Sequence, residues 1–192
     1  MDDRIMKKLN IAFAATTLAL ILGQQAYAAD GTITFNGEVT DVTCIVSAGT
    51  GADTTIKLPT VAVSAFGSLA NTTAGATPFA ISLTGCASTA GALAQPKSVA
   101  VYFEPGSNVN ADGRLNNTVT TGGATNVDIA LYQASANTKP LVLGQIPSAG
   151  YSTISSTAPA TTMNFLAKYY STDVAVTSGL VSSNVTYSIV YP

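Results

Sequence analysis

Apolar and polar residues alternate one by one in repeated stretches of the chain beyond residue 28. An alternation with a period of two places every second side chain on the same face of an extended strand, and the apolar stripe of an amphipathic helix is missing from the sequence. The pattern therefore predicts β-strands at residues 32–40, 43–47, 55–58, 79–84, 98–103, 127–132, 141–143, 163–170 and 184–191.

Turn-forming residues separate these predicted strands. Clusters of Gly, Asn, Asp, Ser and Pro predict turns at residues 48–53, 71–77, 107–113, 121–125 and 148–160. Residues 68–76 could also hold a short helical turn. Many short strands at regular intervals are typical of a β-sandwich, and the sequence contains neither an internal repeat nor a sign of a second domain. We therefore expect one all-β domain.

The beginning of the chain has the pattern of an export signal. Two lysines precede an apolar run at residues 11–22, and the small residues of Ala26-Tyr27-Ala28 follow. The alternative is a membrane anchor, but this run is too short for the roughly 30 Å of hydrocarbon in a bilayer. We predict a cleaved signal peptide at residues 1–28, with translation starting at Met1 or Met6.

Charge is sparse and scattered in the predicted mature chain, residues 29–192. It contains five basic and eight acidic residues, without a basic cluster that could neutralise phosphates, so we expect no nucleic-acid partner. Only 9% of all residues are charged, but 47% are hydrophobic. That apolar content is sufficient for a folded core, and the length suits one domain.

The chain contains two cysteines, Cys44 and Cys86. An even number of cysteines in an exported chain indicates a disulfide, which would constrain the unfolded chain by about 4 kcal/mol. The alternative is a two-thiol metal site. Because the chain contains no histidine, a closed zinc site would lack ligands. We predict a Cys44–Cys86 disulfide, no metal and no cofactor.

Residues suited to catalysis are few. Histidine, the usual acid–base residue, is absent, and both thiols are expected to be oxidised. Most acidic residues of the mature chain neighbour Gly, Asn or Pro, where turn and cap roles are common. Asp112-Gly113, for example, predicts a hairpin turn rather than a cation site. We therefore predict that the protein is not an enzyme.

The predicted first strand has an apolar face that includes a glycine. Ile33, Phe35, Gly37 and Val39 share this face. Glycine weakens a strand and often marks the close approach of another surface. The segment is therefore either an ordinary first strand with a glycine bulge or a detachable strand whose face fills a groove elsewhere.

The predicted last strand also has one apolar face, formed by Val185, Tyr187, Ile189 and Tyr191. An apolar strand at the end of the chain would promote aggregation if its edge stayed open. We expect this edge to pair with the N-terminal strand of the same chain or with a strand of a neighbour.

Several stretches have the order and spacing found in one protein family. They are residues 31–39 followed by Cys44, residues 78–81 leading to Cys86, residues 164–169, the penultimate Tyr191, and Gly179 as the 14th residue from the C-terminus. In these features the chain resembles the type 1-like fimbrial pilin subunits of the chaperone–usher route. The resemblance extends over the mature chain except for loops at residues 71–77 and 107–125.

The resemblance implies a fold and a set of partners. The fold would be an incomplete immunoglobulin-like β-sandwich, the pilin fold, which lacks its last strand. Residues 29–42 would be an N-terminal donor-strand extension and residues 43–192 the pilin domain. Implied partners are neighbouring pilin subunits in a head-to-tail homopolymer, a periplasmic chaperone, an outer-membrane usher and, through the fibre, a host surface. The chain would be secreted through the periplasm into an extracellular fimbrium.

The resemblance also implies roles for the two terminal strands. The donor face would consist of Ile33, Phe35, Gly37 and Val39, and the acceptor-groove and chaperone-recognition strand would contain Gly179, Val185, Tyr187, Ile189 and Tyr191. We expect a major shaft pilin that polymerises by donor-strand exchange and supports adhesion. The alternatives are a minor adaptor or tip pilin with a ligand-binding role and a stand-alone secreted β-sandwich binding module.

Overall fold

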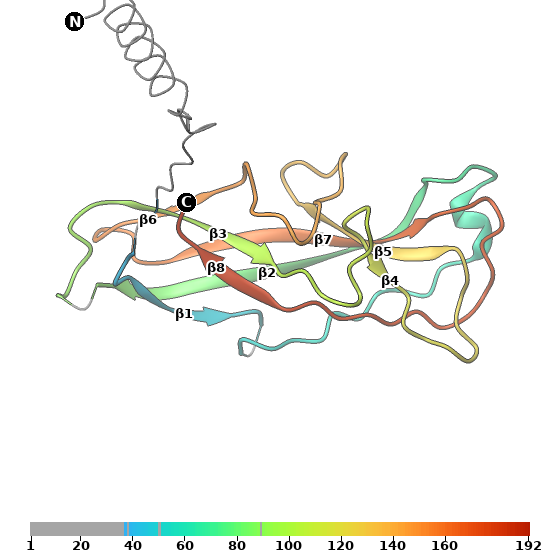
Figure 1. The fold of residues 1–192 in the computed structure, drawn as a ribbon, viewed down its shortest axis with the longest axis horizontal. Helices are drawn as coiled ribbons and strands as arrows, with labels where there is room; N and C mark the ends of the chain where they lie inside the picture. Colours follow the sequence, from blue (N-terminus) through green and yellow to red (C-terminus); the bar gives the residue numbers. More distant parts are fainter. Residues whose placement is uncertain (1–36, 38, 50, 89) are drawn as a thin grey trace, which may run out of the picture. The chain divides into compact units, whose positions relative to one another are not determined.

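The computed structural model describes residues 37, 39–49, 51–88 and 90–192. The chain divides into two units, Met1–Val39 and Thr40–Pro192. The predicted signal peptide and most of the predicted donor strand lie outside the described residues. In chain order, the elements are β1 (Thr43–Ser47), the 3₁₀-helix η1 (Val63–Phe66), β2 (Thr73–Ala87), β3 (Lys97–Phe103), β4 (Leu115–Asn116), β5 (Val127–Gln133), β6 (Ser152–Ile154), β7 (Thr161–Ser171) and β8 (Tyr187–Val190) (Figure 1).

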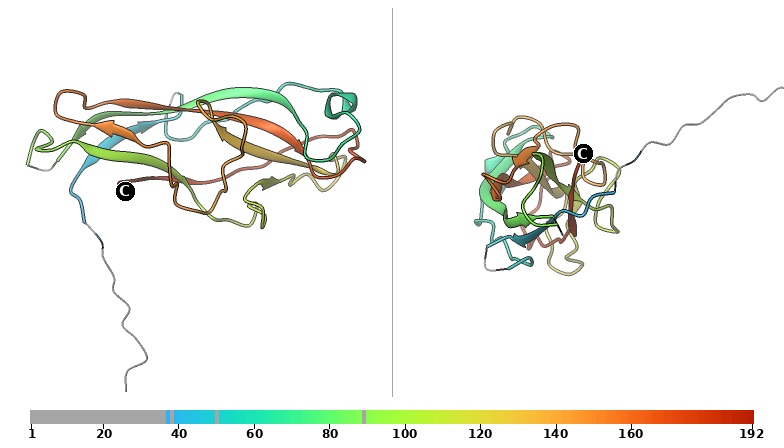
Figure 2. Two further views of the ribbon diagram at one scale, coloured as in Figure 1. Left: turned by 90° about the horizontal axis from the view of Figure 1, so that it is seen from above. Right: turned by 90° about the vertical axis from the view of Figure 1, so that its left-hand side faces the viewer.

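The second unit is built from two antiparallel sheets. One has the strand order β1-β2-β7-β5-β4 and the other the order β6-β3-β8. The strands of both sheets lie along roughly the same axis (Figure 2). Within the part of the chain that the structure describes, no helix is long and apolar enough to cross a membrane.

A common apolar core joins the two sheets. Leu83 of β2 and Phe165 of β7 are buried together with Val99 and Phe103 of β3. The Phe103 and Phe165 rings meet edge to face, with their centroids 5.4 Å apart, a preferred arrangement of aromatic pairs. Because inward side chains of both sheets meet in one core, the predicted β-sandwich is confirmed.

Four strands lie close to where the alternation predicted them. They are β1, β3, β5 and β7, whose bounds differ from the predicted ranges by two residues at most. The turn predicted at Asp112-Gly113 is also confirmed. The amide of Gly113 donates to the carbonyl oxygen of Asn110 at 2.9 Å, and Val109 bridges to Leu115 across this turn. Strong local patterns were therefore sufficient for these elements.

The turn predicted at residues 71–77 is wrong, because β2 begins at Thr73. The strand continues through Gly75, which has a φ of 66° and lies where the pairing register with β7 shifts. Glycine adopts this conformation without strain. Pairing with β7 therefore overrides a local composition that is typical of turns, and β2 is longer than the predicted strand at 79–84.

Two predicted strands are absent from the described structure. Residues 55–58 alternate between exposed and half-buried side chains but have no ladder partner. Residues 141–143 bond instead to two different segments, Leu141 to Leu131 and Leu143 to Gly113. Alternation predicted the extended backbone, but a strand also needs a continuous partner.

Two short elements, β6 and η1, differ from the prediction. Strand β6 lies within the predicted turn at residues 148–160, because three of its residues pair with the beginning of β3. The short helical turn considered for residues 68–76 occurs earlier, as η1. Both depend on tertiary contacts, since Phe66 of η1 and Ile154 of β6 are buried.

Candidate polymerisation site between the first and last strands

Strand β8 lies at the end of its sheet and pairs with β3 along one edge. The amide of Glu104 donates to the carbonyl oxygen of Thr186 at 2.9 Å, which continues the ladder beyond the assigned strand. Because successive backbone groups of a strand point to opposite edges, the even-numbered residues face β3. The odd-numbered residues direct their amides and carbonyls to the other edge, where the described residues provide no backbone partner.

The same arrangement extends upstream of β8. The amide of Thr118 donates to the carbonyl oxygen of Ser182 at 2.8 Å, and that of Ala124 to the carbonyl oxygen of Leu180 at 2.9 Å. These bonds again use even-numbered residues. The open edge therefore runs from Val181 to Tyr191, which we call the acceptor edge. Strand β8 is thus shorter than the strand predicted at 184–191, whereas the open edge that contains it is longer than that prediction.

The side chains of the acceptor edge form an apolar stripe. Half-buried and exposed residues alternate from residue 181 to residue 189. The half-buried apolar members pack against the core, and they are Val181, Val185, Tyr187, Ile189 and Tyr191. The four residues predicted for this face are therefore brought together on one stripe. Their half-burial means that the core covers the stripe only in part.

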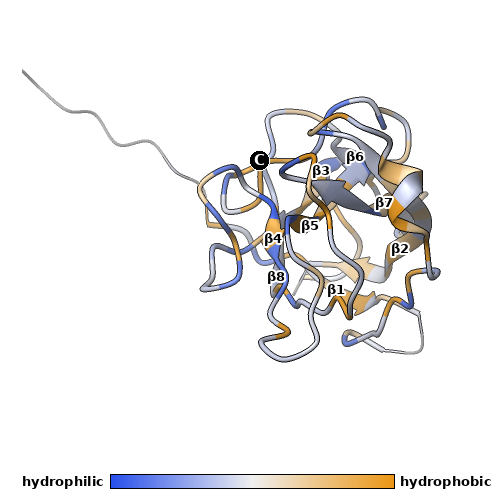
Figure 3. Cartoon of the chain, turned by 90° about the vertical axis from the view of Figure 1, so that its right-hand side faces the viewer, coloured by the Kyte–Doolittle hydropathy of each residue, from blue (hydrophilic) through white to orange (hydrophobic). Residues whose placement is uncertain are grey.

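Strand β1 faces β8 across a seam between the sheets. It is the edge strand of the other sheet, and half-buried Cys44 and Val46 pack on the core from it. Leu58, in the extended segment after β1, packs on the same core. Figure 3 shows the strands close to end-on, with β1 and β8 next to each other on the lower side of the sandwich. No backbone hydrogen bond joins β1 to β8 in the described structure.

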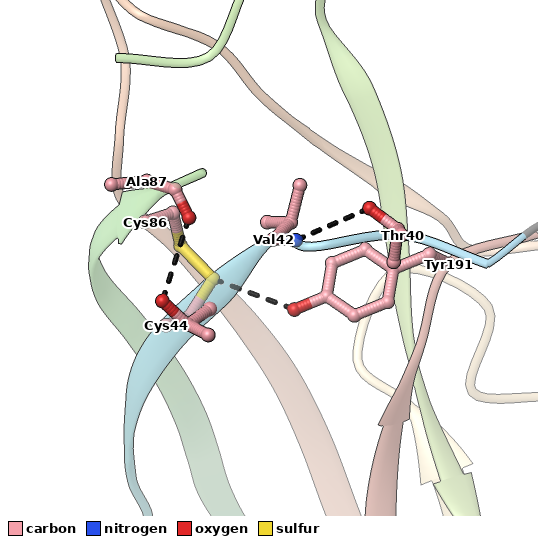
Figure 4. The surroundings of a disulfide bond; sticks show 7 residues. Thr40, Val42, Cys44, Cys86, Ala87 and Tyr191 are labelled. Carbon is pink, nitrogen blue, oxygen red and sulfur yellow. Dashed lines mark hydrogen bonds between the residues drawn. A yellow bond between two sulfur atoms is a disulfide. The ribbon is translucent and has the colours of Figure 1, made fainter. Parts of the chain in front are cut away.

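Two tyrosine hydroxyls cross the seam. The Tyr191 hydroxyl lies 3.7 Å from Sγ of Cys44 (Figure 4). The Tyr187 hydroxyl donates to the carbonyl oxygen of Ala52 at 2.7 Å. These contacts hold the acceptor edge beside β1 while both backbone edges stay open. Sequence patterns identified the two tyrosines but gave no sign of their partners, Cys44 of β1 and Ala52 in the turn that follows it.

Burial raises the pKa of both seam tyrosines above the ordinary value. For Tyr187 the negative charge of Asp53 adds to this effect, since it opposes a second negative charge nearby. Both hydroxyls therefore remain protonated at neutral pH and can donate hydrogen bonds.

The predicted disulfide between Cys44 and Cys86 is confirmed. It joins β1 to β2 and spans a sequence separation of 42. Because β1 is an edge strand, the disulfide fixes one border of the seam to the neighbouring strand β2 of the larger sheet. The described residues contain no group of three or more potential metal ligands from His, Cys, Asp and Glu.

Gly179 lies just before the acceptor edge, against the loop of residues 122–124. A Cβ atom at Gly179 would lie 2.3 Å from the amide nitrogen of Ala124 and 2.7 Å from the carbonyl oxygen of Gly123. Leu180 bonds to the same loop. A glycine is therefore required here by the close approach of two backbones. The pair Gly122-Gly123 was the sequence signal that could have indicated this contact.

The predicted donor face is described only in part. Ile33 and Phe35 lie outside the described residues. Gly37 and Val39 are described, and the side chain of Val39 is fully exposed.

Comparisons with known proteins identify the family. Residues 58–192 match the family described as FimA, type-1 fimbrial protein, A. The chain is 42% identical over 173 residues to the major fimbrial subunit SMF-1 of Stenotrophomonas maltophilia, covering 86% of this chain and 95% of that protein. It is 40% identical over 183 residues to the F17 fimbrial protein of Escherichia coli, covering 94% and 98%.

The fold agrees with a solved pilus structure. The chain is similar to a subunit in the structure of a chaperone–usher pilus, with a TM-score of 0.56 and 21% identity, covering 88% of this chain and 100% of that one. This similarity confirms the predicted immunoglobulin-like pilin fold. The protein is accordingly a structural subunit and not an enzyme, and its relatives form fimbriae on the cell surface. The chain belongs to the type-1 fimbrial protein family and is a subunit of an extracellular fimbria.

Proposed function

We propose that this chain is the major shaft pilin of its fimbria, that it polymerises by donor-strand exchange, and that the fibre supports adhesion. The observation that carries the proposal is the acceptor edge, an eleven-residue edge with open backbone groups and a half-covered apolar stripe. The similarity of the whole chain to a relative named as a major fimbrial subunit supports the shaft role.

In this proposal residues 29–42 of one subunit complete the sandwich of the next, whose pilin domain is residues 43–192. Addition of a strand to a sheet edge is an established recognition mode, and donor-strand complementation of pilins is a known instance of it. The incoming backbone would satisfy the open groups of the acceptor edge. Burial of Ile33, Phe35 and Val39 would contribute about 1.5–3 kcal/mol for each side chain.

The position of the chain ends favours antiparallel addition. Cys44, where the pilin domain begins, lies beside Tyr191 at the C-terminal end of the acceptor edge. A donor strand antiparallel to this edge leaves it near Val181. The Cys44 end of the donating subunit then contacts the Val181 end of the accepting subunit. Contacts between two different surfaces of this kind do not close a dimer and propagate into a fibre.

An isolated subunit with this edge would aggregate. In the proposed pathway a periplasmic chaperone covers the edge first, recognising Gly179 and the stripe residues Val185, Tyr187, Ile189 and Tyr191. The donor strand of the next subunit replaces the chaperone strand at the outer-membrane usher.

Deletion of residues 29–40 tests the proposal. The truncated subunit should still bind its chaperone, because its acceptor edge is intact, but it should form no SDS-resistant polymer. Electron microscopy of the cells should show no long fibres. Fibres of normal length from the truncated subunit, or a stable monomer that needs no chaperone, would refute the proposal.

A glycine substitution tests the donor face with a matched control. Gly37→Leu adds bulk on the face that enters the neighbour and should block polymerisation. Asn36→Leu places the same leucine side chain on the opposite face of the expected strand and should leave polymerisation close to normal. Equal effects of the two substitutions on SDS-resistant ladders would contradict the assigned donor face.

A further inference from the structure

Ser183 lies on the inward face of the acceptor edge, between the apolar residues Val181 and Val185. Among the described residues its Oγ is the only buried side-chain oxygen or nitrogen that has no hydrogen-bond partner. The backbone of the adjacent Ser182 is fully used, because its amide donates to Oδ1 of Asn117 and its carbonyl accepts from Thr118. The neighbouring residues Asn117 and Thr118 therefore bond to Ser182 and not to the hydroxyl of Ser183.

A buried hydroxyl without a partner costs free energy, so an isolated subunit retains a polar group that a suitable partner would stabilise. The Oγ atom has no accessible surface in the isolated subunit, so a partner reaches it only when the Ser183 side chain turns toward an incoming strand. Among the described residues, the other edge of residues 180–190 is already bonded to β3 and to residues 117–124, which leaves the acceptor edge for that strand. The occupant must therefore be the strand that completes this edge. In the proposed function that strand is residues 29–42 of a second copy.

We propose that Ser183 is a positioning residue that fixes the register of the donor strand, with its hydroxyl bonded to the donor backbone at Gly37 of the neighbouring copy. This inference rests on the proposed function. The acceptor edge, residues 181–191, has eleven residues, and so do residues 29–39, the part of the donor extension that ends at Val39, the last residue of the donor face. Full antiparallel overlap sets Ala29 opposite Tyr191 and Gly37 opposite Ser183.

Glycine is the donor residue that suits this position. Without a Cβ atom, the donor backbone can approach the serine hydroxyl closely. In this register the amide and carbonyl of Gly37 pair with the backbone of Ser183. The carbonyl oxygen of Gly37 still has a second lone pair, so the Ser183 hydroxyl can donate to it. The same register sets Phe35 opposite Val185 and Val39 opposite Val181, which leaves apolar residues facing apolar residues.

The register needs such a device because alternation alone does not fix it. A slip by one residue turns the apolar face outward, but a slip by two keeps it inward. The two-residue slips would set Phe35 or Val39 against the buried hydroxyl of Ser183. That hydroxyl would then stay unpaired, so Ser183 disfavours the registers that hydrophobicity permits.

The first test measures uptake of a synthetic peptide of residues 29–42 by the subunit purified with its periplasmic chaperone. Ser183→Ala should weaken peptide binding about three- to tenfold, the range expected for one hydrogen bond. Ser182→Ala, the same change on the adjacent exposed residue, should leave it unchanged. Binding by Ser183→Ala that equals or exceeds that of the wild type would overturn the inference.

The second test reads the register directly. A Val185→Cys subunit is mixed with peptides containing Ile33→Cys, Phe35→Cys or Gly37→Cys, and disulfide adducts are quantified. The Phe35→Cys peptide should dominate, and adding Ser183→Ala to the subunit should spread the adducts to the other two peptides. Preference for another peptide, or a pattern that Ser183→Ala does not change, would overturn the inference. If the wild-type subunit takes up no peptide at all, the proposed function itself fails.

Discussion

The hydroxyl of Tyr191 lies 3.7 Å from Sγ of Cys44, so the end of the last strand touches the disulfide of the first strand. This contact brings together residues 147 positions apart. It sets the border of the seam at which the chain is expected to accept a strand from its neighbour, and it makes the disulfide part of that site.

Removal of the disulfide should destabilise the subunit. In Cys44→Ser/Cys86→Ser the unfolded chain regains freedom over a sequence separation of 42, and the free energy of unfolding should fall by about 4 kcal/mol. Urea denaturation of the subunit complemented with the 29–42 peptide measures this loss. Wild-type protein treated with a reducing agent should lose a similar amount. An unchanged urea midpoint would contradict the prediction.

Substitution of Gly179 should loosen the start of the acceptor edge. In Gly179→Ala the new Cβ would lie 2.3 Å from the amide nitrogen of Ala124, and overpacking of this kind costs about 1–3 kcal/mol. Gly106→Ala is the control, because a Cβ there has no atom within 4 Å. Thermal unfolding should separate the two variants. If both unfold at the wild-type temperature, Gly179 is not required for packing and its role lies elsewhere.

The ion pair between Arg114 and Asp128 should matter more than the pair between Arg114 and Asp112. Nε of Arg114 lies 3.0 Å from the Asp128 carboxylate, and these side chains are only 13% and 10% exposed, whereas Asp112 is 68% exposed. The Arg114 guanidinium also lies 4.4 Å from the centre of the Tyr170 ring.

Arg114→Ala should therefore cost about 3–5 kcal/mol, because it leaves the buried carboxylate of Asp128 without a cation. The neutral amide of Asn110, which donates to this carboxylate at 2.9 Å, does not balance its charge. Asp112→Asn should cost less than about 1 kcal/mol, as expected of an exposed pair. Chemical denaturation of the peptide-complemented subunit provides both values. Equal costs would show that burial does not separate the two pairs.

The seam tyrosines should make the protein sensitive to alkali. Burial raises the pKa of Tyr187 in the folded state, while in the unfolded chain a tyrosine titrates near pH 10. The unfolded state thus releases its proton first, and stability falls as the pH rises above about 10. Tyr187→Phe should reduce the difference in urea midpoint between pH 8 and pH 11. A difference as large as that of the wild type would exclude Tyr187 as a source.

Side-chain periodicity was sufficient for the regular parts of the fold. Strands β3, β5 and β7 lie close to where the sequence predicted them, and apolar residues of all three contribute to the core. Pairing partners were harder to predict. Residues 55–58 alternate in the same way without forming a ladder, while residues 73–77 have the composition of a turn and are drawn into β2 by β7.

The candidate site shows the same division. The sequence identified the apolar residues Val185, Tyr187, Ile189 and Tyr191 correctly as one face, because alternation places them there. It did not indicate that the open edge begins at Val181, which depends on hydrogen bonds from the distant residues Thr118 and Ala124. Nor did it single out Ser183, whose unpaired hydroxyl is visible only once its neighbours in space are known.

The sequence by itself determined the all-β class, the single possible disulfide and the apolar face of the last strand, and it predicted the export signal and the apolar face of the first strand, because each depends on residue type and local spacing. The tertiary structure decided which edges stay open, which tyrosine meets which partner, and why Gly179 must be a glycine. These depend on distances between residues far apart in the chain, and such distances exist only after the two sheets have packed against each other.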